Sequence, residues 1–326
     1  MNLLLPEHKL STMLLQHQEL ISVAARCGIE LGLGDKTTRE VCASQSIDVD
    51  FFVALLNTVS HERYYAEQLL RPNSTLLLVD YLKKTHVYYR QALLPVAQVH
   101  VQKLMMSAGV SNRILQQVEE RFSQFEEKIL RFFSQVEEEL FAYIKHLYNN
   151  NLNLAAGRAI HEVDVELFGS DMVALRVQSD KVKTLLWDSL NLLVKDLVGN
   201  FDRPLRNAAI FHISAIEKDF SAYIRLLERL LSPAILDMRN NLISKKLENI
   251  FRHNSQHVDA SENKELSERE REILALIAKG LKSKEVAQQL NISRNTVQAH
   301  RKNISAKLGL KTISELTVYA VMNGVG

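Results

Sequence analysis

The sequence predicts an all-α protein, and two observations carry that prediction. Eleven Gly and five Pro in 326 residues leave little room for the many tight turns of a β-rich chain. Apolar residues recur at i, i+3 and i+4 spacing through four long segments, whereas the period-two alternation of a half-buried strand is absent. Without alternating strands and helices, the fold of a phosphoacceptor receiver domain is excluded.

We expect three domains and one linker along the chain. Residues 1–72 contain short helices, one of them capped by Asp48, and form a small N-terminal domain. Residues 73–251 contain four long helical segments with short polar connections, which is typical of an antiparallel four-helix bundle. These segments are 76–100, 111–149, 173–200 and 206–251. The polar, aperiodic stretch 252–264 is expected to be a flexible linker before a compact domain at 265–326.

Composition excludes several classes of protein. The two cysteines, Cys27 and Cys42, are too few for a disulfide framework or a zinc ribbon, and they suit a reducing compartment. The N-terminus lacks a basic region followed by an apolar core, and no run of about 18 apolar residues is free of charge. We therefore expect a cytoplasmic protein with no membrane partner.

The charge of the chain is unevenly distributed. Residues 265–326 contain ten Lys or Arg and six Asp or Glu, a balance of +4, while the rest has 30 basic and 32 acidic residues, a balance of −2. A small basic module on a near-neutral body favours a polyanionic partner for that module, although an ordinary solvated helical surface has the same composition.

Capping signals divide the basic module into helices. Ser267 and Glu270 form a capping box at the start of one helix, and Gly280 ends it. A second helix is expected from 283 to 290, and Ser293 caps a third helix after a tight turn of three residues. Two helices across such a turn are the helix-turn-helix arrangement, in which the later helix enters the major groove of DNA.

The motif resembles the LuxR-type (NarL/FixJ-type) helix-turn-helix, with the helix-turn-helix itself at about 282–301. The family's pattern is met almost position by position, by Glu265, Leu266, Arg269, Glu270, Glu272, Leu274, Gly280, Lys284, Glu285, Ala287, Leu290, Ser293, Thr296, Val297, His300, Asn303, Ile304, Lys307 and Leu308. The resemblance implies a DNA-binding transcription regulator, and it covers the last 62 residues of the chain.

The resemblance also implies which side chains face DNA. The positions that contact bases or the backbone on the third helix are Thr296, Gln298, Ala299 and Lys302, and those near phosphates are Lys284, Arg294 and Arg301. Lys or Arg binds guanine or phosphate, and Gln pairs with adenine. Gln298 stands where many members of the family have Lys, so one cationic contact of those members is missing here.

A fourth helix, 314–322, has an apolar face formed by Leu316, Val318, Tyr319 and Val321. In the family this helix packs under the DNA-facing helix and often pairs with a second copy, so a homodimer is expected. Packing inside the module is the alternative explanation for some or all of these four side chains.

The upstream region more faintly resembles the iron-sulfur-cluster repair (RIC) proteins. The segment 28–42 is similar to their N-terminal domain, except that Gly32 and Leu33 stand where the family has a Cys-Cys pair. The segments 85–95 and 161–164 look like two helices of that family's hemerythrin-like di-iron domain, and they contain His86 and His161. The resemblance spans roughly residues 15–235.

Four of the six iron ligands of that family are missing. The two His/Glu pairs expected on the other helices are Phe132/Val136 and Tyr223/Leu227 here, so His86 and His161 are vestigial ligand positions. Two neutral imidazoles do not offset the charge of two iron ions. Glu137 and Glu228 lie one residue further on, about 100° around an α-helix, and are expected to point away from the core.

We therefore predict a metal-free, hemerythrin-like bundle in a one-component, non-enzymatic transcription regulator. The bundle is expected to receive an unidentified small-molecule or protein signal, and no cofactor is expected. The alternative is a stress or iron-repair protein that keeps iron or haem and has a DNA-binding tail. No Gly-rich phosphate loop, nucleophile elbow or Cys-x-x-Cys pair points to another chemistry.

Overall fold

The computed structural model describes residues 3–64, 72–108, 112–156, 158, 167–256, 266–310, 312–323 and 325. In these residues all regular structure is helical, apart from one isolated β-bridge between Lys9 and Thr37, and the all-α prediction is confirmed. None of the helices described is long and apolar enough to cross a membrane. Contacts divide the chain into two units, residues 1–150 with 160–238 and residues 151–159 with 239–326.

The N-terminal part of the first unit contains four short helices around an apolar core. They are α1 (Leu10–Gln16), α2 (Glu19–Arg26), α3 (Thr38–Ser44) and α4 (Val49–Ser60). Asp48 caps α4 as predicted, since its Oδ1 accepts a hydrogen bond of 2.8 Å from the Phe51 amide. Thr37 and Glu40 form a capping box at α3. The helix α4 buries every residue from Phe51 to Thr58, because it packs against α2, α3 and α10.

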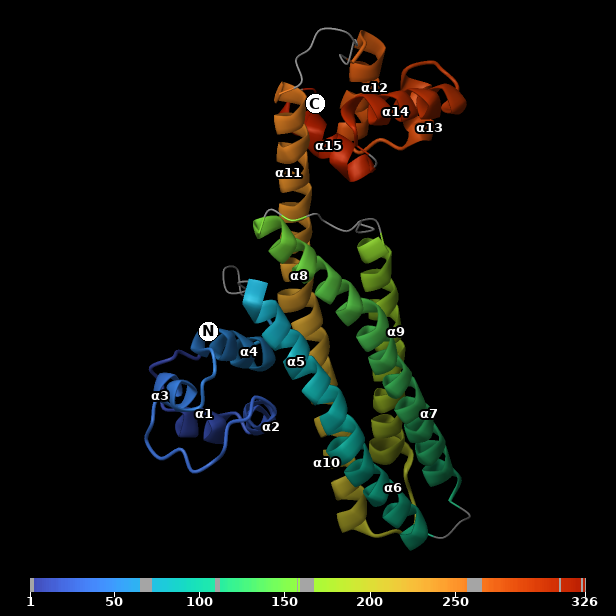
Figure 1. Ribbon diagram of the computed structural model, residues 1–326. Coiled ribbons are helices and arrows are strands. Elements are labelled where there is room, and N and C mark those ends of the chain that lie inside the picture. The colour runs from blue at the N-terminus through green and yellow to red at the C-terminus, as the bar shows by residue number, and fades with distance from the viewer. Residues whose placement is uncertain are drawn as a thin grey trace. The chain divides into compact units, whose positions relative to one another are not determined.

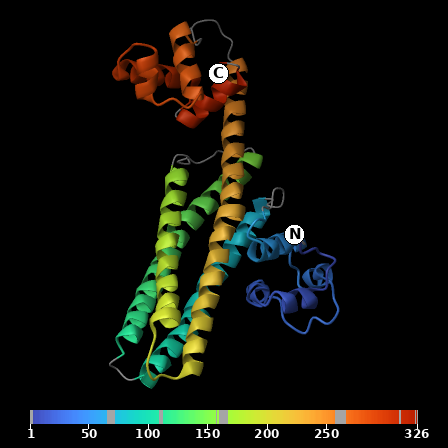
Figure 2. The same cartoon turned by 180° about the vertical axis from the view of Figure 1, so that it is seen from behind.

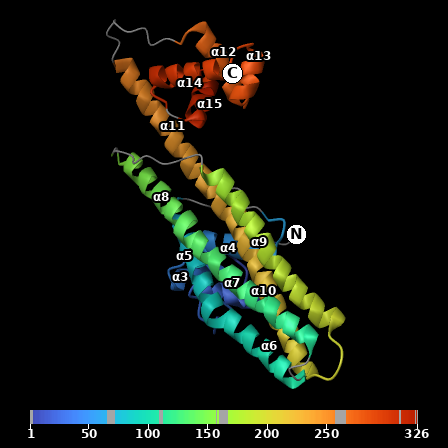
Figure 3. The ribbon, with the colours of Figure 1, turned by 90° about the vertical axis from the view of Figure 1, so that its right-hand side faces the viewer.

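Four long helices follow the small helices (Figure 1). Each contains a π-helical segment, which interrupts three of the helices and ends the third one. The first long helix comprises α5 (Pro72–Tyr88), η1 (Tyr89–Leu93) and α6 (Leu94–Ala108), and the second comprises α7 (Arg113–Gln135), η2 (Val136–Phe141) and α8 (Ala142–Ala155). The third comprises α9 (Leu167–Asn191) and η3 (Leu192–Asp196). The fourth comprises α10 (Arg203–Leu226), η4 (Leu227–Leu231) and α11 (Ser232–Gln256). Packing of α6 on α7, α7 on α9, α9 on α10 and α10 on α6 closes the bundle (Figure 3).

The ends of the long helices differ from the predicted ones for local reasons. The fourth helix begins at Arg203 rather than 206, because Asp202 caps it (Oδ1 to the Leu205 amide, 2.9 Å) and Pro204 fits its first turn. The third helix ends at Asp196 rather than 200, where Leu197 becomes extended. The last helix runs to Gln256, into the predicted linker, and residues 257–264 lie outside the described residues.

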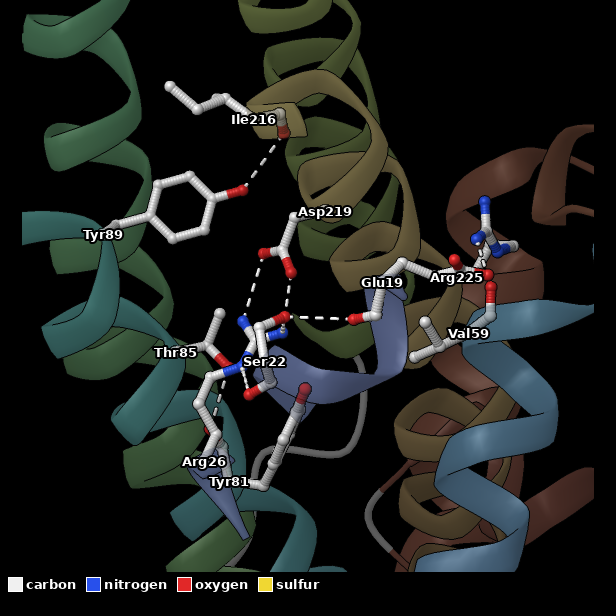
Figure 4. Close-up of polar contacts among 10 residues, drawn as sticks. All are labelled: Glu19, Ser22, Arg26, Val59, Tyr81, Thr85, Tyr89, Ile216, Asp219 and Arg225. Carbon is white, nitrogen blue, oxygen red and sulfur yellow. Dashed lines mark hydrogen bonds and ion pairs between the residues drawn. The ribbon is translucent and has the colours of Figure 1, made fainter. Parts of the chain in front are cut away.

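A buried ion pair joins the N-terminal helices to the bundle (Figure 4). The Arg26 guanidinium of α2 donates to both carboxylate oxygens of Asp219 on α10, at 2.6 and 3.1 Å. It also lies 5.2 Å from the ring centroids of Tyr81 and Tyr88 on α5. Because Arg26 is only 8% exposed, this pair is shielded from water and holds α2 against α5 and α10. Figure 2 shows the N-terminal helices beside the bundle from behind.

Candidate nucleic-acid interface

The C-terminal module is built from α12 (Glu268–Ala278), α13 (Ser283–Gln289), α14 (Arg294–Leu308) and α15 (Ile313–Met322). The predicted caps are confirmed: Ser267 and Glu270 form a capping box on α12, and the Ser293 side chain accepts from the Thr296 amide at 3.0 Å. Gly280, at φ +83°, follows the C-cap of α12 in the left-handed region, where a side chain is strained. Local sequence signals therefore fix the start and end of the helices that carry the candidate interface.

The turn between α13 and α14 is held from two sides. Asn291 takes a left-handed conformation at φ 54°, and the Ile292 amide returns to the Ala287 carbonyl at 3.0 Å. Arg269 of α12 donates to the Leu290 carbonyl at 2.9 Å. These bonds fix the angle at which α14 leaves the turn.

A second polar contact ties α14 to α12. The Lys307 ammonium donates to Glu270 at 2.7 Å, and Glu270 is only 4% exposed. Burial would raise the pKa of Glu270, but hydrogen bonds from Lys307 and Ser267 outweigh it and lower the pKa. Arg269 and Lys307 thus stabilise the packing of the module. These two cations therefore have a structural role and are not needed at the surface.

Five of the seven predicted DNA-facing residues line two hollows that share Arg301. Six of the seven are exposed, and Arg301 is half-buried because it donates to Ser283 of α13 at 3.0 Å. One hollow of about 440 Å³ brings together Lys284, Arg294 and Arg301, the three residues expected near phosphates. A second hollow of about 740 Å³ is lined by Gln298, Arg301 and Lys302, together with the C-terminal turns of α14. Thr296 and Ala299 are exposed on the same helix.

Sequence reasoning missed Lys282. This side chain lines the 440 Å³ hollow with Lys284, Arg294 and Arg301, and it is the N-cap residue of α13. The signal was present, because a Lys at the start of a helix next to predicted phosphate contacts belongs to the same cationic cluster. The Lys282 amide donates to the Glu285 carboxylate at 2.6 Å, and this bond fixes the backbone of Lys282 at the start of α13.

The same module is found in known proteins. Residues 264–320 match the family model described as "Bacterial regulatory proteins, luxR family". The C-terminal module is a LuxR-type helix-turn-helix domain. The match covers this domain and not the bundle or the N-terminal helices, so it assigns no family to the rest of the chain.

Curated relatives share the LuxR-type region over part of their length. The protein called "Oxygen regulatory protein NreC" is 38% identical over 120 residues in Staphylococcus aureus strains bovine RF122 / ET3-1, MRSA252 and JH9. The alignment covers 36% of this chain and 54% of each relative. The chain therefore spans about half the length of the curated relatives it matches.

The LuxR-type domain also bears on the predicted pairing through its fourth helix. Leu316 is 1% exposed, and α15 packs on α12, so packing inside the domain accounts for Leu316. Tyr319 is half-buried, while the side chains of Val318 and Val321 lie outside the described residues. Pairing through this helix stays a prediction.

A second group of polar side chains lies inside the bundle, around His86. His86 is fully buried; its Nδ1 lies 2.5 Å from Glu137 Oε1 and its Nε2 lies 2.8 Å from the Tyr223 hydroxyl. Its ring stacks on Phe133 at a centroid distance of 4.1 Å. Burial lowers the pKa of His86 to about 4, although the Glu137 carboxylate opposes this. The neutral ring therefore donates from Nδ1 to Glu137 and accepts from Tyr223, whose pKa burial raises.

The expectation that Glu137 points away from the core is wrong. It assumed an α-helix, but Val136–Phe141 form a π turn, η2, which holds more residues per turn. Glu137 reaches the buried His86 from this segment, while its side chain stays 34% exposed and also lies 3.6 Å from Arg90. Glu228 does lie at the surface, 3.7 Å from Arg176.

The described residues do not fit a di-iron centre. Phe132, Val136, Tyr223 and Leu227 stand where the di-iron proteins that the sequence resembles have ligands; each is at most 2% exposed and fills the interior. Both ring nitrogens of His86 are occupied by protein groups, and no three His, Cys, Asp or Glu side chains of the described segments gather closely enough to hold a metal ion. His161 lies outside the described residues.

Proposed function

We propose that this protein is a sequence-specific, DNA-binding transcription regulator. The observation that carries the proposal is the exposed surface of the LuxR-type domain, where residues from α13 and α14 form one cationic cluster next to Gln298. The helix α14 has no acidic residue in its first turn and no Asp or Glu anywhere along its length. Such a helix suits the negatively charged major groove.

The two hollows suggest a division of roles. Lys284, Arg294 and Arg301 would bind phosphates and position the domain, a role that Lys282 can share. Gln298 and Lys302, on the exposed face of α14, would reach base edges, with Gln298 suited to adenine and Lys302 to guanine. Thr296 would contribute a hydroxyl contact to the DNA, and Ala299 would contribute an apolar contact.

We further propose that the protein is a one-component regulator that binds its DNA in the cytoplasm. The N-terminal helices and the bundle, which resembles a degenerate hemerythrin-like domain of the iron-centre repair proteins, would bind a small molecule or protein signal. A signal that prefers one arrangement of the bundle would shift the population of DNA-competent homodimers. We assign no catalytic residue and no cofactor in this scheme.

Genome-wide mapping of bound sites, followed by titration of labelled duplexes, tests the proposal. Lys302→Ala should weaken binding to a mapped site, with discrimination falling by about 1–3 kcal/mol at one base pair if Lys302 contacts a base. If it contacts a phosphate, all sequences should weaken alike and the salt slope should fall by about one unit. Arg271→Ala is the charge-matched control, because Arg271 is exposed on α12 and lines neither hollow.

No enriched sites and no salt-dependent duplex binding by the wild-type chain would refute the proposed function. Wild-type affinity of Lys302→Ala would instead remove Lys302 from the interface.

A further inference from the structure

Two histidines lie side by side where the first and the fourth long helices of the bundle pack together. His100 is on α6 and His212 is on α10, and these two helices contact each other within the first unit (Figure 1). Their ring centroids are 4.5 Å apart, and the ring planes are tilted by 32°. Both side chains are half-buried, so the pair is accessible from solvent. Neither histidine belongs to the DNA-facing surface or to the polar group around His86.

One hydrogen bond prepares His100 as a metal ligand. Its Nδ1 lies 2.8 Å from the carbonyl oxygen of Val96, one turn earlier in the chain. A carbonyl oxygen can only accept, so Nδ1 carries the proton, and Nε2 of the neutral ring keeps its lone pair. A bond from the second ring nitrogen to a backbone carbonyl is one of the arrangements that orient metal-bound histidines.

The ring of His212 is also available. Within the part of the chain that the structure describes, this ring makes no hydrogen bond, and its contacts are with the rings of His100 and Phe211. Burial lowers the pKa of His212, and the neighbouring His100 lowers it further. The neutral form, which is the form that binds metals, is therefore favoured at His212.

The distance between the two rings fits a shared ion. With metal–nitrogen bonds of about 2.0–2.1 Å, two imidazoles on one ion have ring centroids about 4.5–5.2 Å apart, for bond angles at the metal from about 90° to about 109°. The observed 4.5 Å lies at the short end of this range. Rotation of the side chains, without movement of either helix, can therefore direct one nitrogen of each ring at the same ion.

The type of donor selects the ion. Imidazole nitrogen suits zinc, copper and nickel, whereas magnesium and calcium prefer oxygen ligands. Among the described residues no third His, Cys, Asp or Glu side chain joins the pair in a group of three, so water has to complete the coordination. Such an open site binds more weakly than a structural site with four protein ligands.

We propose that His100 and His212 together bind one divalent transition-metal ion, Zn²⁺, Cu²⁺ or Ni²⁺, which links α6 to α10. The site is separate from the di-iron positions of the resembled family, because it uses other residues and contains no carboxylate. It is also independent of the proposed DNA binding, since both histidines lie in the bundle. An ion that binds the folded chain and not the unfolded one stabilises the bundle.

Calorimetric titration of the full, tag-free chain with ZnCl₂, and with NiCl₂ as a second probe, tests the site. His100→Ala and His212→Ala should each weaken the binding of Zn²⁺ at least about tenfold, which is the smaller loss found when only an outer-shell partner of a metal ligand is removed. His146→Ala, which removes an exposed histidine of α8, is the matched control and should bind Zn²⁺ like wild type. MgCl₂ should give no heat of binding at the pair.

Thermal unfolding followed by circular dichroism gives a second readout. Zn²⁺ should raise the unfolding midpoint of wild type and of His146→Ala, and it should leave the midpoints of His100→Ala and His212→Ala unchanged. Spectra recorded without metal check that each variant is folded.

A wild-type chain that binds neither Zn²⁺ nor Ni²⁺ overturns the proposed site, and so does binding of wild-type strength in both His100→Ala and His212→Ala. Two sites in wild type, of which each single variant keeps one with unchanged affinity, would show that the histidines bind separate ions. That result would overturn the shared site as well.

Discussion

Lowering the pH should destabilise the bundle through His86. The folded state lowers the pKa of this buried ring from its ordinary 6.5 to about 4, mainly because burial disfavours the imidazolium. Below pH 6.5 the unfolded chain therefore takes up a proton that the folded chain does not, and stability falls as the pH decreases towards 4. Between pH 7 and pH 5 this difference amounts to about 2 kcal/mol at 25 °C.

Urea unfolding followed by circular dichroism and by Trp187 fluorescence at pH 5, 6 and 7 measures this loss. His86→Gln is the reference, because glutamine can hydrogen-bond Glu137 and Tyr223 but does not titrate. Wild type should lose about 2 kcal/mol more than His86→Gln between pH 7 and pH 5. Any constant cost of the substitution cancels in that comparison. Equal losses in the two proteins would show that the pKa of His86 is the same in the folded and unfolded chains. That result would refute the argument that burial lowers this pKa.

Three further predictions concern the docked helices, the DNA-binding domain and iron. Asp219→Ala leaves the buried Arg26 unpaired and should cost about 3–5 kcal/mol in thermal or urea unfolding, whereas Asp35→Ala, which removes a surface partner that is 88% exposed, should cost less than about 1 kcal/mol. A fragment of residues 265–326 should be soluble, helical and able to bind DNA, and an aggregated fragment would show that the domain needs the bundle. Elemental analysis after anaerobic purification with ferrous iron should find no stoichiometric di-iron centre; two irons per chain would revive the repair-protein alternative.

Much of the fold could be predicted because its helix boundaries depend on local chemistry. Asp48, Ser267, Gly280 and Ser293 act within one helical turn of their own position, so their residue types carry the prediction. Sequence periodicity places the start of the helix at Arg203 three residues late, because Pro204 can mark either a break or the first turn of a helix, and here it lies in the first turn.

The candidate interface was predictable for a different reason. A short motif with strict spacing fixed α13, the turn and α14, and the exposed residues on α14 followed from helical periodicity. The bond between Arg301 and Ser283 was not predictable, since it joins residues 18 positions apart across the turn. Arg301 lines both hollows, so it can contribute to both.

The interior of the bundle could not be predicted, because it depends on π turns. No residue type marks a π turn, so the sequence pattern places none of the four segments. The chemistry inside the bundle adds to this: Glu137 of η2 accepts a hydrogen bond from one nitrogen of the buried His86 ring, and Tyr223 bonds the other nitrogen. A buried polar group without a partner costs about 1–3 kcal/mol, so the bonds to Glu137 and Tyr223 together allow His86 to stay buried among apolar side chains. These bonds join residues 51 and 137 positions apart in the chain, so no local signal in the sequence could have predicted how the core accommodates His86.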